Sequence, residues 1–210
     1  MPELPEVETV VTSLRPRLVG RTIKIVEVYL SKMIKFYDVD ELKKQVIGQK
    51  IVNISRRGKY FIIDLTGDCL LVGHLRMTGR LTMAVSGMPL DKYTHIIFKL
   101  DNDTELRFAD MRQFGCLYLV RREEVEKISG LATLGPEPLA EDLTLNLFRE
   151  RVGNRKVKIK QLLLNQEFVA GIGNIYADEI LFAAGVNPNR IAGSLTPEEI
   201  TRIFQSMREV

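Results

Sequence analysis

The stretch Leu134-Gly135-Pro136-Glu137-Pro138-Leu139 divides the 210-residue sequence into two parts of different character. Two prolines and a glycine within six residues prevent a continuous helix or a central strand, because proline lacks a backbone N–H donor. We therefore predict a linker over residues 134–142, a β-sandwich domain over 1–133 and a helical domain over 143–210. The predicted fold class is α+β and multidomain.

Upstream of the linker, short apolar runs follow one another and turn residues separate them. Alternating apolar and polar residues predict strands at 23–30, 51–55, 60–65, 69–75, 95–100, 106–108 and 117–120, with one short helix at 40–47. So many short strands favour a sandwich or a flattened barrel. A leading helix is predicted before them, because apolar residues recur at helical spacing at Val7, Val10, Val11, Leu14 and Leu18.

Downstream of the linker, apolar stripes predict helices at 143–152, 157–164, 174–184 and 197–210. The last helix has strong start signals, with Thr196 as N-cap, Pro197 at the first helical position and Glu199 three residues after the cap.

The composition is that of a globular protein, with 45% hydrophobic and 27% charged residues. A net charge of +3 permits an anionic partner without requiring one. No apolar run has membrane-spanning length and no signal-peptide pattern is present, so we expect a cytoplasmic protein without a membrane partner. Cys69 and Cys116 are expected to be reduced core residues, since two cysteines cannot form a four-cysteine zinc site.

The first residues, Met1-Pro2-Glu3-Leu4-Pro5-Glu6, carry the sharpest chemical signal. If an aminopeptidase removes Met1, Pro2 presents a secondary amine. Because α-amino groups titrate near pH 8, a fraction of these amines is neutral and nucleophilic at neutral pH. Such an amine condenses with a sugar aldehyde carbon to give a cationic iminium, and Glu3 is close enough to move a proton. The alternative is that Pro2 and Pro5 only introduce the first helix.

One basic segment has a composition that is suited to binding nucleic acid. In Arg56-Arg57-Gly58-Lys59-Tyr60, three cations crowd a turn between strands, and phosphate contacts by cations release counterions. Lys59 begins a predicted strand, and this position would fix the direction of the lysine side chain. The alternative is a solvated turn.

The segments His74-Leu75-Arg76-Met77-Thr78-Gly79 and Asp110-Met111-Arg112-Gln113-Phe114-Gly115 indicate a wedge. Phe114 could split a base step while Arg112 and Met77 fill the space of an extruded base. The alternative is that Met77 and Phe114 are core residues and Arg112 is a surface charge.

The segment Ala170-Gly171-Ile172-Gly173-Asn174-Ile175-Tyr176-Ala177-Asp178-Glu179 places two glycines at the start of a predicted helix. Glycines there let backbone N–H groups approach a phosphate, and the basic run 155–160 lies upstream. A dinucleotide site is disfavoured because no strand precedes the glycines. The alternative is a helix–turn–helix corner that serves packing alone.

Taken together, these segments resemble the formamidopyrimidine-DNA glycosylase family over essentially the whole sequence. The opening Met1–Thr9 and the stretch Gly171–Glu179 are highly specific, and Arg57–Tyr60, His74–Met77, Arg112–Gly115 and Leu134–Pro138 follow in the family's order. The resemblance implies a β-sandwich with a leading helix, then a helix-two-turn-helix domain. It implies a glycosylase and AP lyase that excises oxidised purines, such as 8-oxoguanine and formamidopyrimidines, from damaged double-stranded DNA as a monomer.

The resemblance also implies roles for single residues. Pro2 attacks the sugar C1′, Glu3 handles protons at the sugar ring, and Lys59 contacts a phosphate and assists β- and δ-elimination. The positions that match DNA-contacting or gap-filling residues are His74, Met77, Tyr93, Arg112, Phe114, Arg155 and Asn174.

Two departures from the family pattern stand out. Tyr93-Thr94-His95 occupies a place where the family often has His-x-His, and the four-cysteine zinc finger of longer members has no counterpart in 1–210. No cofactor is expected in this chain, whereas zinc is expected in full-length family members. The alternative function is a DNA-binding or lesion-sensing fragment without catalysis.

Overall fold

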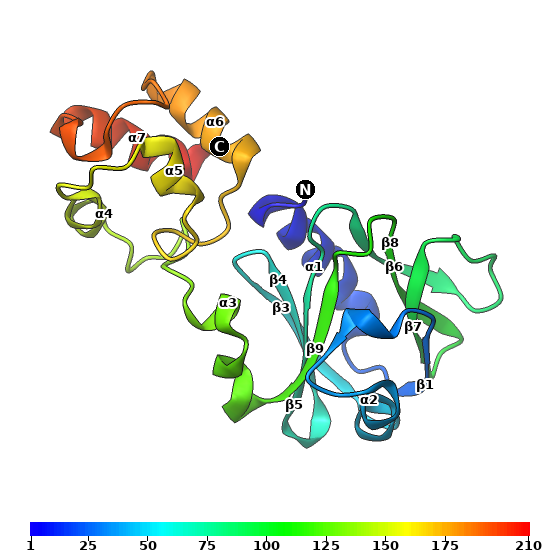
Figure 1. Ribbon diagram of the computed structural model, residues 1–210. Coiled ribbons are helices and arrows are strands. Elements are labelled where there is room, and N and C mark those ends of the chain that lie inside the picture. The colour runs from blue at the N-terminus through cyan, green and yellow to red at the C-terminus, as the bar shows by residue number, and fades with distance from the viewer. The chain divides into compact units, whose positions relative to one another are not determined.

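The computed structural model describes all 210 residues, which divide into two compact units, Met1–Ile128 and Ser129–Val210. In Figure 1 the first unit runs from blue to green and the second from green to red. Every named strand belongs to the first unit, and the second is built from helices and loops. The predicted α+β class, with a leading helix, a β-sandwich and a helical part, is confirmed. Residues 134–142, predicted as a linker, lie inside the second unit.

Two sheets make up the first unit. One has the order β1-β7-β8-β6, formed by Ile23–Val28, Thr94–Leu100, Thr104–Asp110 and Gly79–Val85. The other has the order β2-β9-β5-β4-β3, formed by Ile34–Lys35, Cys116–Arg121, Cys69–His74, Tyr60–Leu65 and Ile51–Arg57. All pairings are antiparallel except that of β2 with β9.

A single apolar core joins the two sheets. Phe61 of β4 and Phe108 of β8 meet edge to face, with ring centroids 6.0 Å apart. Gly73 of β5 makes room for this contact, since a Cβ there would lie 1.9 Å from Cζ of Phe61. Aromatic pairs of this geometry contribute about 0.5–1.5 kcal/mol beyond their buried area.

The leading helix α1, Leu4–Leu18, is capped at its start and bonded to β3 of the β domain. The backbone N–H of Glu3 donates to Oε2 of Glu6 at 2.9 Å, which satisfies one of the donors left open at a helix start. Farther along, Arg56 Nε of β3 lies 2.7 Å from Oε2 of Glu8. Gly20, with φ +86°, ends the turn that follows the helix. The first residues are therefore held at one place on the sandwich.

The remaining short elements of the first unit are α2, Val39–Val46, and the 3₁₀ turns η1, Ser31–Met33, η2, Thr66–Asp68, and η3, Arg122–Lys127. The side chain of Asp38 accepts the N–H of Glu41 at 2.8 Å and caps α2, which Gly48 follows with φ +86°.

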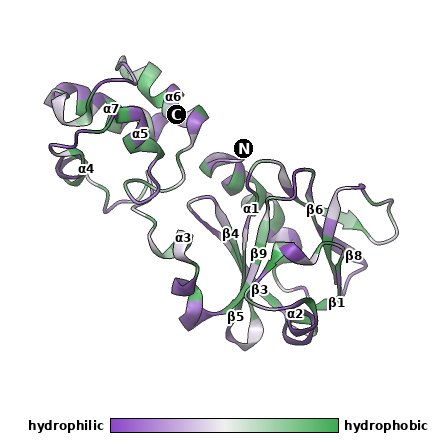
Figure 2. Ribbon diagram, in the orientation of Figure 1, coloured by the Kyte–Doolittle hydropathy of each residue, from purple (hydrophilic) through white to green (hydrophobic).

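The second unit contains α3, α4, α5, α6, η4 and α7, formed by Ser129–Ala132, Leu145–Val152, Ile159–Leu164, Asn174–Ala184, Ala192–Ser194 and Pro197–Glu209. Figure 2 shows polar and apolar residues mixed along these helices, as expected when one face of each is buried. The predicted capping box of α7 is confirmed, because Thr196 Oγ1 accepts from Glu199 N while Glu199 Oε2 accepts from Thr196 N.

Two strands were not predicted from the sequence, the two-residue β2 and the longer β6. Gly79 begins β6, where a Cβ would lie 2.3 Å from the carbonyl oxygen of Leu75. A glycine before an apolar–polar alternation is equally compatible with a turn and with a strand that starts against another backbone. The close approach is local, because the backbone N–H of Gly79 donates to the carbonyl oxygen of Leu75, four residues earlier, at 2.9 Å.

Candidate nucleic-acid interface and catalytic site

Two connections between the sheets emerge at the same end of the sandwich. Residues 75–78 lead from β5 to β6, and residues 111–115 lead from β8 to β9. The register aligns Tyr60, His74 and Cys116 across one sheet and Gly79 with Asp110 in the other. Lys59 directly precedes Tyr60, so it belongs to the same end. We call Lys59 together with residues 75–78 and 111–115 the loop edge.

Lys59 is a buried cation beside a buried carboxylate. It sits in a two-residue turn between β3 and β4, where Gly58 takes φ +55° at the first position, as type II′ hairpins require. The side chains of Lys59 and Glu3 are only 7% and 2% exposed. Burial lowers the pKa of Lys59, and the nearby charge of Glu3 opposes that change. The alternative of a solvated turn therefore fails for Lys59.

The chain start lies beside this pair. Glu3 precedes the first residue of α1 and is covalently joined to half-buried Pro2, while Met1 is 45% exposed. Glu3 and Lys59 are thus near each other, and Pro2 is next to Glu3. The roles of Pro2, Glu3 and Lys59 in catalysis remain predictions.

His74 is a neutral histidine at the end of β5. Its Nδ1 accepts the backbone N–H of Arg76 at 3.0 Å, and its ring meets Tyr60 edge-on with centroids 4.6 Å apart. Burial, then the positive charges of Arg76 and Lys59, lower the pKa of His74 to about 3. Because Nδ1 accepts, the neutral ring carries its proton on Nε2, from which it can donate to a phosphate oxygen.

Met77, Arg112 and Phe114 come together on the loop edge. Arg112 Nη1 lies 3.5 Å from the sulfur of Met77, and the Arg112 guanidinium lies 4.8 Å from the centre of the Phe114 ring. Met77 is 44% exposed and Phe114 is 55% exposed. The alternative that these two are core residues is therefore wrong. Large apolar side chains grouped with a cation at loop tips are typical of a binding surface.

Tyr93 reaches the same region through its backbone. It is half-buried, its carbonyl oxygen accepts the N–H of Asp110 at 2.9 Å, and Lys92 Nζ lies 4.9 Å from the centre of its ring.

Two buried residues near Tyr93 received no role in the sequence analysis, namely His95 and Asp110. His95 Nε2 lies 2.9 Å from the carbonyl oxygen of Asp110. An aspartate between a strand and a loop was the available signal, because aspartate often accepts backbone N–H groups of the following turn.

The helical unit holds the other two predicted DNA-contacting residues. Asn174 is exposed at the first position of α6, after the turn of Gly171, whose φ is +91°. Gln166 fixes this turn, since its Oε1 accepts the N–H of Gly171 at 2.9 Å and its Nε2 donates to Ile172 O at 2.7 Å. The arrangement places the positive end of an eleven-residue helix behind a rigid turn.

Arg155 lies elsewhere in the helical unit, in the loop between α4 and α5. It is exposed, its Nε donates to the carbonyl oxygen of Arg151 at 2.8 Å, and its guanidinium lies 5.9 Å from the centre of the Phe168 ring. The structure thus groups the predicted residues of the β domain, whereas in the helical unit Arg155 lies in the loop between α4 and α5 and Asn174 begins α6.

The residues of this chain do not fit the zinc that the resemblance implies for longer members. Cys69 and Cys116 are buried at opposite ends of β5 and β9, since Cys69 pairs with Arg121 and His74 pairs with Cys116. Within residues 1–210, no group of three or more His, Cys, Asp or Glu residues is arranged to hold a metal ion. No helix here is both long and apolar enough to cross a membrane.

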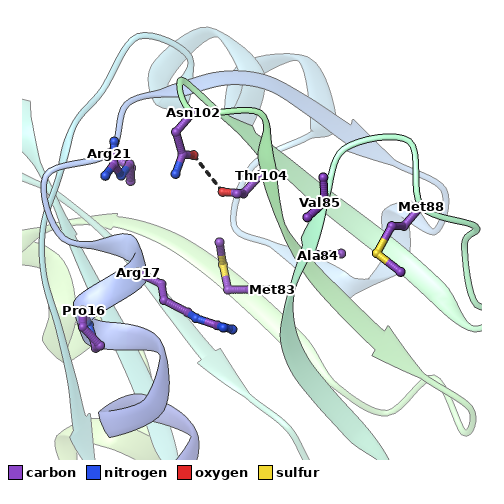
Figure 3. Close-up of a pocket in the computed structure, with 9 residues that line it drawn as sticks. All are labelled: Pro16, Arg17, Arg21, Met83, Ala84, Val85, Met88, Asn102 and Thr104. Atoms are coloured by element: carbon purple, nitrogen blue, oxygen red, sulfur yellow. Dashed lines mark hydrogen bonds between the residues drawn. The ribbon is translucent and has the colours of Figure 1, made fainter.

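A pocket of about 340 Å³ lies at the other end of the β domain (Figure 3). A hydrogen bond from Thr104 Oγ1 to Asn102 Oδ1 braces one wall. α1 is about 20 Å long at 1.5 Å per residue, so the pocket at its C-terminal end is far from Glu3. No nucleophile or titrating acid lines it, and the lining residues are Pro16, Arg17, Arg21, Met83, Ala84, Val85, Met88, Asn102 and Thr104.

Comparison with known proteins identifies both units. Residues 1–117 match the model of the formamidopyrimidine-DNA glycosylase N-terminal domain, and residues 134–210 match that of the formamidopyrimidine-DNA glycosylase H2TH domain. Formamidopyrimidine-DNA glycosylases of Pelotomaculum thermopropionicum and Moorella thermoacetica are 46% and 47% identical over 210 residues. The alignments cover this chain completely and 76% and 77% of the two relatives.

Solved structures of formamidopyrimidine-DNA glycosylases have a fold that is similar to that of this chain. The Lactococcus lactis formamidopyrimidine-DNA glycosylase, non-covalently bound to DNA containing an AP site, matches with a TM-score of 0.92 and 39% identity over 99% of this chain and 79% of that one. A mutant of the same enzyme in complex with Fapy-dG-containing DNA matches with a TM-score of 0.93, 39% identity and coverage of 99% and 76%. With both domains matched in order and relatives 46% identical over its full length, the chain belongs to the formamidopyrimidine-DNA glycosylase family of bifunctional DNA repair enzymes.

Proposed function

We propose that this protein excises oxidised purines from duplex DNA and then cuts the strand, using Pro2 as nucleophile once Met1 is removed. The partner is damaged double-stranded DNA, bound by a single copy of the chain. The observation that carries the proposal is the burial of Lys59 within reach of the charge of buried Glu3, which follows Pro2, in the unit that also presents Met77, Arg112 and Phe114 at its loop edge.

The chemistry follows from these groups. The Pro2 nitrogen forms a bond to C1′ as the bond between C1′ and the damaged base breaks, and the base leaves with a proton. Glu3 passes a proton to the ring oxygen O4′ as the sugar opens, which yields an iminium between Pro2 and C1′. Loss of a C2′ proton then expels the 3′ phosphate, and a second elimination expels the 5′ phosphate.

Lys59 is suited to hold a phosphate beside the lesion. Burial removes most of its hydration, so a phosphate oxygen meets a cation that water screens little. His74, with its proton on Nε2, adds a neutral donor at the same end of the sheet. Arg155 and Asn174 offer phosphate contacts from the helical unit.

Met77, Arg112 and Phe114 support a second part of the proposal, extrusion of the damaged nucleotide. A base taken out of the stack leaves a gap, and unstacking costs a few kcal/mol. Two exposed apolar side chains in contact with one guanidinium provide groups to fill that gap and wedge the neighbouring step.

The test is borohydride trapping with a duplex that contains 8-oxoguanine. Protein whose Met1 is shown by mass spectrometry to be absent should give a covalent adduct, and Pro2→Gly should reduce or abolish it. Pro5→Gly is the matched control, because it changes a proline in the same turn without touching the terminal amine. Equal trapping in protein that retains Met1, or no trapping by processed wild type bound to the duplex, would contradict the proposal.

The second candidate is a DNA-binding or lesion-sensing protein without catalysis. It is favoured by the exposure of Met1, Arg155 and Asn174, since binding through the loops does not require processing of the chain start. It predicts salt-dependent binding to damaged duplex with neither an adduct nor strand cutting.

A further inference from the structure

The carboxylate of Asp110, 1% exposed at the end of β8, lies between the two loops of the loop edge. Its Oδ1 accepts the hydroxyl of Thr78, from the loop that carries Met77. The same oxygen accepts the backbone N–H of Arg112 at 3.2 Å, and Oδ2 accepts that of Gly115 at 2.7 Å. One buried side chain thus binds both loops.

Thr78 completes the connection. While its hydroxyl donates to Asp110, its oxygen accepts the N–H of Arg112 at 3.0 Å. A triangle of hydrogen bonds therefore joins Asp110, Thr78 and the backbone of Arg112. Two residues of these loops hold left-handed backbone conformations, with φ +56° at Arg76 and +58° at Gln113. Such conformations are costly for residues other than glycine and persist where the surroundings fix them.

Only an ionised carboxylate can serve all of these donors. Burial raises the pKa of Asp110, but the hydrogen bonds from Thr78 and from the backbone of Gly115, Arg112 and Phe114 outweigh it and hold the pKa below its usual value. A carboxylate accepts at every lone pair, whereas an amide of the same shape presents two N–H donors on one side.

We propose that Asp110 is a positioning residue that links the two loops, so that Met77, Arg112 and Phe114 meet DNA as one preassembled wedge. The proposal rests on the proposed function for its DNA step. Side chains that are already in contact, Arg112 with Met77 and Arg112 with Phe114, lose less freedom on insertion than side chains on two independent loops. The linked loops therefore favour extrusion of the base, and they are not needed once the base is gone.

The first measurement uses the free protein. Hydrogen exchange of the Arg112 and Gly115 amides should be at least about tenfold faster in Asp110→Asn than in wild type, and that of Arg112 at least about tenfold faster in Thr78→Val. Thr78→Ser keeps the hydroxyl and should exchange as wild type does. The matched control is Glu105→Gln, which alters another buried carboxylate of β8, paired with Arg107 at 2.7 Å and away from both loops. Unchanged exchange at Arg112 in both Asp110→Asn and Thr78→Val would overturn the link.

The second measurement compares two DNA substrates. Asp110→Asn and Thr78→Val should slow excision from an 8-oxoguanine duplex at least about tenfold more than they slow cutting at a preformed abasic site, while Glu105→Gln leaves the ratio unchanged. Fluorescence of 2-aminopurine beside the lesion should rise more slowly by the same factor. Equal loss on both substrates would overturn the proposal. If wild type neither binds nor cuts either duplex, the proposed function fails, and the exchange rates alone decide whether Asp110 links the loops.

Discussion

The two units of this molecule differ in what they bury. The β domain encloses most of the buried polar and charged residues, whereas the helical unit encloses a single serine, Ser206, in an otherwise apolar core. Those of the β domain are Glu3, Lys59, His74, Thr94, His95, Glu105, Arg107 and Asp110. The candidate DNA-contacting residues of the helical unit, Arg155 and Asn174, are exposed.

This difference in burial suits the two units to different functions, catalysis and DNA binding. Proton transfer and covalent chemistry need groups whose hydration and pKa are altered by burial. Contacts to the DNA backbone need hydrated cations that release counterions on binding. Mutations in the β domain should therefore change rate and pH dependence, and mutations in the helical unit should change affinity and salt dependence.

The largest effect is expected at Glu3. Glu3→Gln removes the carboxylate beside Pro2 and Lys59 while it keeps the shape of a side chain that is almost fully buried. Excision and strand cutting should fall by about 10²–10⁴-fold, the usual contribution of a positioned acid or base. Single-turnover kinetics on an 8-oxoguanine duplex measure this loss, with Glu126→Gln, an exposed carboxylate of η3 in the same unit, as control. A loss below tenfold at Glu3, or an equal loss at Glu126, would contradict the expected difference between buried and exposed carboxylates.

A smaller effect is expected from the pH dependence of stability at His74. The folded pKa is about 3 and the ordinary value is 6.5, so the unfolded chain takes up a proton that the folded β domain resists. The contribution is complete above pH 6.5 and falls by about 1.4 kcal/mol per pH unit between there and pH 3.

His74→Asn keeps an acceptor for the Arg76 N–H and removes the titration. Urea unfolding followed by circular dichroism, from pH 7 to pH 4, should then show a flatter profile than wild type. An identical slope in the two proteins would mean that His74 does not titrate as its burial implies.

The smallest effect is expected at Arg155. Arg155→Ala should weaken duplex binding several-fold for damaged and undamaged DNA alike, and it should reduce the slope of log K against log salt by about 1. Arg17→Ala, which removes an exposed cation from the pocket of Figure 3, at the end of the β domain opposite the loop edge, is the control and should leave the slope unchanged. Salt titrations by fluorescence anisotropy measure both. A change in catalytic rate without a change in slope would show that Arg155 acts in catalysis and not in contacts to the DNA backbone.

Much of the fold could be predicted from local pattern. The leading helix buries Val7, Val11, Leu14 and Leu18, and α6 spans the predicted 174–184. The strand β6 could not be predicted, because a glycine after Thr78 is equally compatible with a turn and with the start of a strand. What makes residues 79–85 a strand is their pairing with β8, which exists only in the folded sheet. Asp110 was missed for a related reason. Its partners, Thr78 and Gly115, come from separate loops, and the sequence does not state which loops meet.

The sequence by itself determined the α+β class, the helical second part and the identity of the motifs, because capping, periodicity and turn chemistry act over a few residues. Tertiary structure alone decided that Met77 and Phe114 are exposed while Lys59, His74 and Asp110 are buried. Burial depends on which strands pair and where the chain passes between the sheets. That placement converts ordinary lysine, histidine and aspartate side chains into groups of altered pKa at one edge of the sandwich.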